Sequence, residues 1–153
     1  MGRFGKLEIS IKPQKKNKRY QQGYDEVYYI NRARKSYLSG DFESALRYYS
    51  RALGYNVAIE KAWVGQVFCL IDLGEFNEAV VWADKGLEVI PDSYDLLAVK
   101  AMALGRVGEM ERAIGWCDQA FKKGTNSPIL WLARGDIVVP SNFKNGLFCF
   151  GKA

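Results

Sequence analysis

Hydrophobic positions along the chain recur at helical spacing, and between residues 60 and 93 they outline two amphipathic helices. The turn-forming run Leu73-Gly74-Glu75 separates the two helices, and Pro91 ends the second because proline has no backbone N–H to continue it. The apolar faces of these two helices are Trp63, Val67, Leu70 and Ile71, and Ala79, Val80, Ala83 and Leu87.

The same pattern returns every 34 residues along the chain. Columns of similar residues keep this step, namely Gly40/Gly74/Gly108, Phe42/Phe76/Met110, Ala45/Ala79/Ala113, Tyr48/Trp82/Trp116, Ala52/Gly86/Ala120 and Leu53/Leu87/Phe121. A column of large residues extends the period to a fourth unit, with Tyr29, Trp63, Leu97 and Trp131. The period predicts four helix pairs, over residues 26–59, 60–93, 94–127 and 128–153.

This pattern resembles the tetratricopeptide repeat (TPR) family, and the second unit carries the resemblance most clearly. Its residues are Trp63, the run Leu73-Gly74-Glu75-Phe76-Asn77-Glu78-Ala79, the pair Gly86-Leu87, and Pro91. The resemblance covers residues 26–153 and implies an all-α fold, a right-handed α-solenoid of antiparallel helix pairs with four TPR-like units. It also implies a non-enzymatic scaffold that binds another protein.

The fourth unit departs from the period. Its turn, residues 139–142, contains one residue more than the other turns, so we expect residues 128–153 to be irregular and truncated. Leu147, Phe148 and Phe150 follow near the last residue, where a solenoid normally has a polar-faced capping helix. The pattern favours a piece of a longer array, and the alternative is that this C-terminal edge docks on another chain.

In the TPR family the first helix of each pair lines a concave groove that binds peptides or helices. Carried onto this sequence, the predicted groove consists of Val27, Ile30, Asn31, Arg34, Lys61, Val64, Phe68, Ile71, Asp95, Val99, Met102 and Arg106. Because this set is largely apolar, we expect an amphipathic helix or an extended hydrophobic segment as the ligand. Two alternatives stay open. Residues 4–13 alternate between apolar and polar and can fill the groove as an extended strand. Two copies of the chain can also pair through the groove.

Two more specific ligand classes are disfavoured. TPR adaptors that bind acidic chaperone tails clamp a terminal carboxylate with several Lys, Arg and Asn side chains. Asn31 and Lys61 supply two such groups here, but Gly65 stands where an arginine is needed. Helical-pair repeats that bind RNA need polar residues at a base-reading column, and that column is aliphatic here, with Ile30, Val64, Ala98 and Leu132.

Charge changes this picture only at the N-terminus. The formal net charge is +5, and residues 1–25 carry all of it. The bases of this basic N-terminal arm are Arg3, Lys6, Lys12, Lys15, Lys16, Lys18 and Arg19. The arm is predicted to be a partly disordered or extended, solvated tail, with phosphate or anionic-lipid binding as the alternative. We expect no specific nucleic acid and no membrane insertion.

Catalytic chemistry finds little support in the sequence. The chain has no histidine, which excludes imidazole bases and His-ligated metals, so we predict no enzyme activity, no metal and no cofactor. Residues 146–153 have the spacing of a phosphate-binding loop, but they lack its preceding strand and its hydroxyl residue. Cys69, Cys117 and Cys149 are widely separated, which indicates buried structural thiols in a reducing compartment, and we expect a cytoplasmic protein.

Two functions therefore remain to be compared. The first is a protein–protein interaction module that binds a peptide or helix in its concave groove. The alternative is a self-assembling structural subunit, a homo-oligomer held together through the groove, the N-terminal arm and the C-terminal edge. Fold resemblance alone names neither a partner nor a process.

Overall fold

The computed structural model describes residues 24–123 and 126–153, and within them the chain forms helices and no strands. The all-α prediction is confirmed. The helices are α1 (Glu26–Leu38), α2 (Phe42–Tyr55), α3 (Glu60–Asp72), α4 (Phe76–Val89), α5 (Tyr94–Val107), α6 (Met110–Lys122), α7 (Pro128–Val138) and α8 (Phe143–Lys152). The basic N-terminal arm lies outside the described residues, except for its last two.

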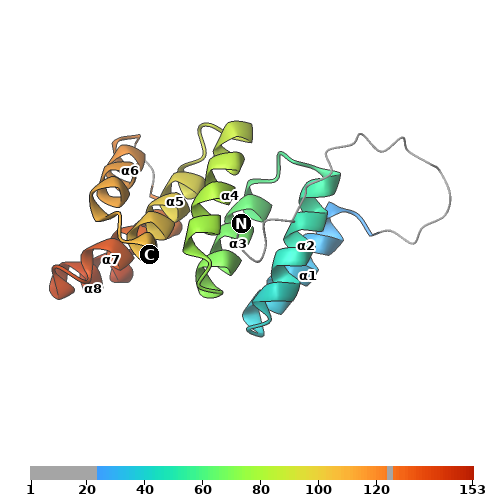
Figure 1. Cartoon of the computed structure of the whole chain (residues 1–153), viewed down its shortest axis with the longest axis horizontal. Coiled ribbons are helices and arrows are strands. Elements are labelled where there is room, and N and C mark those ends of the chain that lie inside the picture. Colours follow the sequence, from blue (N-terminus) through green and yellow to red (C-terminus); the bar gives the residue numbers. More distant parts are fainter. Residues whose placement is uncertain (1–23, 124–125) are drawn as a thin grey trace.

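The helices pair in the order that the period predicts, and the pairs stack side by side into a solenoid (Figure 1). The first helices form an inner layer, in which α3 packs on α5 and α5 packs on α7. Across the described residues, the second helices α2, α4, α6 and α8 make no contact with one another. Each second helix contacts its own first helix and, from α2 to α6, the first helix of the next unit.

Glycine ends three of the first helices in the conformation that the turn requires. Gly40, Gly74 and Gly108 have φ angles of 79°, 78° and 100°, in the left-handed region where a side chain is strained. The fourth turn has no such glycine and runs over four residues, from Val139 to Asn142, whereas each of the other turns has two or three. The turn of the fourth unit is therefore longer than the other three turns and ends its first helix without a left-handed glycine.

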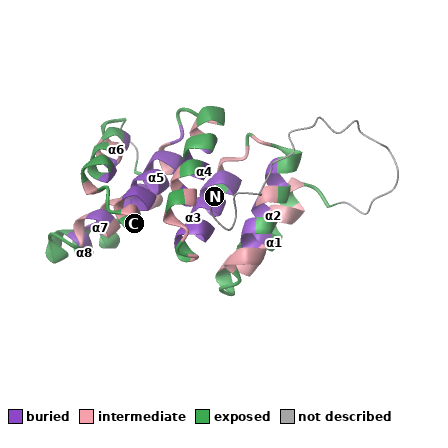
Figure 2. Cartoon of the chain, viewed as in Figure 1, coloured by how far each residue is buried: buried purple, intermediate pink, exposed green. Residues whose placement is uncertain are grey.

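Small residues allow the helices to approach closely. The alanines of one predicted column, Ala45, Ala79 and Ala113, are completely buried, and the core runs through the centre of the stack (Figure 2). At Gly86 an added Cβ would stand 3.0 Å from a methyl carbon of Leu96. The column of small residues therefore marks where helices cross, since ridges interdigitate there.

Polar pairs connect each unit to the next at one repeated position, and we call them the polar ladder. They are Gln66–Ser50, Lys100–Asp84 and Arg134–Asp118. Both sides keep the 34-residue step, so each pair joins a first helix to the second helix of the preceding unit. The side chain of Lys100 is only 8% exposed, and its Nζ lies 2.7 Å from Asp84. A shifted register would leave such buried groups unpaired, so the ladder favours one way of stacking.

Candidate protein-binding face

The accessible surface of the inner layer lies at three repeated positions of the first helices. The second helices and the neighbouring first helices cover the other positions of α3 and α5, which leaves these three as the inward-facing surface. We call this surface the inner stripe, and it consists of Val27, Arg34, Leu38, Lys61, Phe68, Asp72, Asp95, Arg106, Ile129 and Asp136. It corresponds to the predicted concave groove, although its composition differs.

The predicted groove residues divide into three groups by exposure. Val27, Asn31, Arg34, Lys61 and Arg106 are exposed, and Ile30, Phe68 and Asp95 are half-buried. Four apolar members are instead core residues: Val64, Ile71, Val99 and Met102. The largest exposed fraction among these four is 7%, so they support the stripe from below and the expectation of a mostly apolar lining is wrong.

The reason for the burial of Val99 can be seen at the equivalent residue of the preceding unit. Gly65 in α3 lies directly against the ring of Tyr49, so closely that an added Cβ would stand 2.3 Å from the ring atom Cζ. This column of the first helix therefore packs against the second helix of the preceding unit. Asn31 stands in the same column but is exposed, because no helix pair precedes α1 in the described part of the chain.

Several charged groups of the inner stripe are held by other residues of the chain. Arg106 makes two hydrogen bonds to Asp136, at 3.0 Å and 2.6 Å, and these bonds raise the pKa of the guanidinium. Asp95 accepts a hydrogen bond from Ser127, the N-cap of α7. These contacts join α5 to α7 and stiffen the C-terminal half of the stripe.

At the other end of the stripe, Tyr37 donates a 2.5 Å hydrogen bond to Asp72 and so joins α1 to α3. Burial, with the bond to Asp72, raises the pKa of Tyr37 above its usual value, so the phenol remains a donor at neutral pH. On this N-terminal half Arg34 and Lys61 are exposed and Phe68 is half-buried; Lys61 lies seven residues before Phe68 on α3, and Arg34 stands one period before Phe68 on α1. This half of the stripe thus holds two exposed cations, the carboxylate of Asp72 and one half-buried aromatic ring.

The C-terminal edge is apolar. Leu147, Phe148 and Phe150 in α8 are 51%, 61% and 38% exposed, as is Phe143 at 64%, which the sequence analysis did not include. The only charged side chains of α8 are Lys144 and Lys152, so this edge is basic as well as apolar. Residues 146–152, which have the spacing of a phosphate-binding loop but lack its other features, are helical within α8.

The three cysteines are free and buried, as predicted, and burial is the main cause that raises the pKa of Cys69 to about 12. Among the described residues, no group of three or more His, Cys, Asp or Glu side chains is placed to hold a metal ion. None of the described helices combines the length and the apolar character needed to cross a bilayer.

A family model for the tetratricopeptide repeat matches residues 1–142. The chain belongs to the tetratricopeptide repeat family. The TPR resemblance of the sequence and the all-α solenoid are thereby confirmed.

Among curated proteins, this TPR chain is 33% identical over 100 residues to human tetratricopeptide repeat protein 4, across 65% of the chain and 26% of that protein. It is 27% identical over 129 residues to the CTR9 homolog of Arabidopsis thaliana, across 82% of the chain and 12% of that protein. The chain therefore spans about a quarter or less of the length of these relatives.

Two solved structures share the solenoid fold with the TPR chain. One is Cut9-Hcn1, described as a hetero-tetramer of the APC/C, with a TM-score of 0.69 and 15% identity over 84% of this chain and 26% of that chain. The other is MamA from Desulfovibrio magneticus RS-1, with a TM-score of 0.63 and 18% identity over 86% of this chain and 75% of that chain. At such identities the likeness concerns the fold alone.

Proposed function

We propose that this TPR chain is a non-enzymatic scaffold that binds a peptide or helix of another protein on its inner stripe. The observation that carries the proposal is the combination of Phe68 with the exposed cations Arg34 and Lys61 on the accessible face of the first helices. Helical-pair solenoids use such extended inner surfaces for binding. We further propose a cytoplasmic location, which the three free, buried thiols support.

The ligand best suited to this surface is an amphipathic helix or extended segment with an apolar side chain flanked by acidic residues. Phe68 offers the apolar contact, and Arg34 and Lys61 offer two positive charges to carboxylates. The C-terminal half of the stripe, with Arg106 and Asp136 already paired, adds little net charge. We expect no selective binding of acidic chaperone tails, because a carboxylate clamp needs more hydrogen-bond donors than the inner stripe provides.

Quantitative affinity capture from a cell extract tests the proposal. The intact chain is compared with Phe68→Glu, which places a carboxylate on the inner stripe, and with the matched control Val81→Glu on α4. Val81 is 47% exposed and lies on a second helix, away from the stripe. We expect at least one protein to be retained by the intact chain and by Val81→Glu, and to fall tenfold or more with Phe68→Glu. If the same proteins were retained in the same amounts by the intact chain and by Phe68→Glu, the proposal would be contradicted.

The apolar C-terminal edge supports a second candidate function, a self-assembling subunit. Leu147 and Phe148 are more than half exposed on α8, and such side chains commonly pack against a partner. Light scattering over a concentration series separates the two functions, because a scaffold remains monomeric whereas a subunit forms a defined oligomer. If the oligomer forms, Phe148→Glu is expected to dissociate it.

A further inference from the structure

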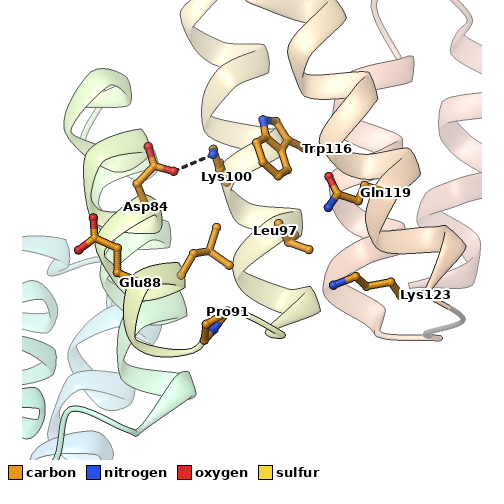
Figure 3. Close-up of a pocket in the computed structure, with 9 residues that line it drawn as sticks. Asp84, Glu88, Pro91, Leu97, Lys100, Trp116, Gln119 and Lys123 are labelled. Carbon is orange, nitrogen blue, oxygen red and sulfur yellow. Dashed lines mark ion pairs between the residues drawn. The ribbon is translucent and has the colours of Figure 1, made fainter.

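A hollow of about 480 Å³ opens on the outer side of the stack, between α4 and α6 (Figure 3). Its floor is α5, which contributes Leu97 and Lys100. The remaining lining residues are Asp84, Leu87, Glu88, Pro91, Trp116, Gln119 and Lys123. None of these residues belongs to the inner stripe, so the hollow is a separate surface. Its volume falls within the range of roughly 300–1,000 Å³ typical of ligand pockets.

The period explains why this hollow is open. One unit earlier, Trp63 stands at the position equivalent to Leu97. Its indole N–H donates a 2.7 Å hydrogen bond to the carbonyl of Val57, and its ring lies 6.0 Å from that of Trp82. Trp63 is only 3% exposed. In that unit, the chain's own indole fills the space between the second helices.

The next unit follows the same rule. Trp131 stands one period after Leu97 and packs its ring 4.8 Å from that of Phe121. Tyr29 supplies the ring in the first unit, 5.5 Å from that of Tyr55. Leu97 is thus the single aliphatic member of an aromatic column, and the hollow lies where its missing ring would stand.

The walls that would contact a ring are already in place. Trp116 occupies the position equivalent to Trp82, and it remains half-buried beside the hollow. The ammonium of Lys100 lies 3.8 Å from the centre of the Trp116 ring and 2.7 Å from Asp84, which fixes this wall. One face of the Trp116 indole is thus covered by the ammonium, and the hollow offers the rest of this indole with the side chains of Leu87 and Leu97 as packing partners.

We propose that this hollow, which we call the ring slot, binds an aromatic side chain of another polypeptide. The incoming ring takes the place that Trp63 holds in the preceding unit, and an indole fits best because the slot's equivalent in that unit accommodates one. A tryptophan buried in such a pocket is a typical anchor residue of protein interfaces. The scaffold then has two recognition surfaces, the inner stripe and the ring slot.

The charges around the slot indicate what flanks the ring. Asp84 and Glu88 line it from α4, and Gln119 and Lys123 line it from the α6 side. Lys100 already pairs with Asp84, which leaves an acidic α4 rim at Glu88, and the basic rim is Lys123, which forms an ion pair at 3.7 Å with the 93% exposed Asp92. Complementary charges on the ligand are a basic residue on one side of the tryptophan and an acidic residue on the other.

Nuclear magnetic resonance on the four tryptophan side chains tests the ring slot. The probes are N-acetyl-tryptophanamide and the peptide acetyl-Lys-Gly-Trp-Gly-Glu-amide, added to the full-length, nitrogen-15-labelled chain. We expect both probes to shift the indole N–H resonance of Trp116 in a saturable way, and to leave that of Trp63 unmoved. No saturable shift at millimolar probe, or equal shifts at all four tryptophans, would overturn the proposal.

Two variants assign the binding to the slot. Leu97→Trp supplies the missing ring from within and is expected to weaken probe binding at least tenfold, whereas the control Leu132→Trp adds a tryptophan to α7 outside the slot and changes nothing. Lys123→Glu, a surface substitution that leaves the core intact, is expected to weaken the peptide several-fold and N-acetyl-tryptophanamide not at all. If Leu97→Trp binds the two probes as tightly as the unmodified chain does, the slot is not the binding site. If Leu97→Trp fails to fold, Lys123→Glu decides, and unchanged peptide binding in that variant gives the same negative answer. Such a result would leave the proposed function intact, because affinity capture through the inner stripe does not depend on the ring slot.

Discussion

At the residue scale, the contact between Gly65 and Tyr49 shows how closely the units are fitted. The first helix of the second unit has glycine where the ring of Tyr49 leaves no room for a methyl group. The sequence analysis placed Asn31 and Val99, which stand one period before and after Gly65, in the groove because they lie on first helices. Which sectors of a helix face neighbours depends on how the units stack, and a repeat pattern alone does not contain that geometry.

Gly65→Ala is expected to destabilise the fold by about 1–3 kcal/mol, because the new Cβ overlaps the ring of Tyr49 and forces it to move. The matched control is Gly115→Ala in α6, where an added Cβ meets nothing within 4 Å. This control is expected to gain up to about 1 kcal/mol through helix propensity. Urea denaturation measures both free energies of unfolding, and equal effects of the two substitutions would contradict the packing described.

Cys69 gives a pH dependence with a definite sign. Burial, aided by the charge of Asp72, raises the pKa of its thiol from 9.0 to about 12 in the folded chain. Above about pH 9 the unfolded chain releases this proton and the folded chain keeps it, so unfolding becomes easier as the pH rises. The stability linked to Cys69 is complete below about pH 9 and is lost on approach to pH 12.

We expect the free energy of unfolding to fall more steeply with pH in the unmodified chain than in Cys69→Ala. The difference in slope is up to about 1.4 kcal/mol per pH unit between about pH 9 and pH 11. Denaturation at a series of pH values measures both slopes. Identical slopes would show that the thiol is not protected in the fold.

At the element scale, the 34-residue columns were sufficient to predict an all-α solenoid of antiparallel helix pairs. The left-handed glycines Gly40, Gly74 and Gly108 carried most of that information, because few other residues adopt their φ angles. The polar ladder was also visible in the sequence, as two columns at the same step. It was missed because a polar column on a helix ordinarily indicates a solvated face, whereas the ladder lies between helices.

The ladder provides an element-scale prediction at the Lys100–Asp84 pair. Asp84→Ala removes the carboxylate 2.7 Å from an ammonium that is only 8% exposed, and we expect a loss of about 1–3 kcal/mol in the free energy of unfolding. The control is Asp92→Ala, whose carboxylate is 93% exposed and 3.7 Å from Lys123, with an expected change within about 0.5 kcal/mol. Thermal or urea unfolding measures both, and a negligible effect of Asp84→Ala would show that the ladder contributes nothing to stacking.

The ring slot also shows that the meaning of a residue column depends on the helices that surround it. Leu97 is the member that breaks an aromatic column, and the sequence analysis counted it simply as one of the large residues of that column. Only the position of α4 and α6 on either side of α5 shows that the smaller side chain leaves a hollow of about 480 Å³. A deviation from a repeat is therefore as informative as the repeat itself, once the neighbours of the deviating residue are known.

At the scale of the whole molecule, the family and the solenoid follow from sequence, whereas the composition of the proposed binding face does not. The sequence indicated an apolar groove, and the structure replaces much of it with a stripe of charged residues around Phe68. The apolar members were assigned to the groove because they lie on first helices, but Val99 and Met102 are needed for the core between units. A stacked array buries more of each central helix than a single helix pair does.

Site-specific photo-crosslinking tests the central claim, that the inner stripe binds another protein, most directly. A benzophenone amino acid is placed at position 68 on the inner stripe or, as the control, at position 81 on α4, and each full-length chain is irradiated in a cell extract. The account predicts discrete crosslinked proteins from position 68 that are absent from position 81. Crosslinks that are the same from both positions, or that arise only from position 81, would contradict it.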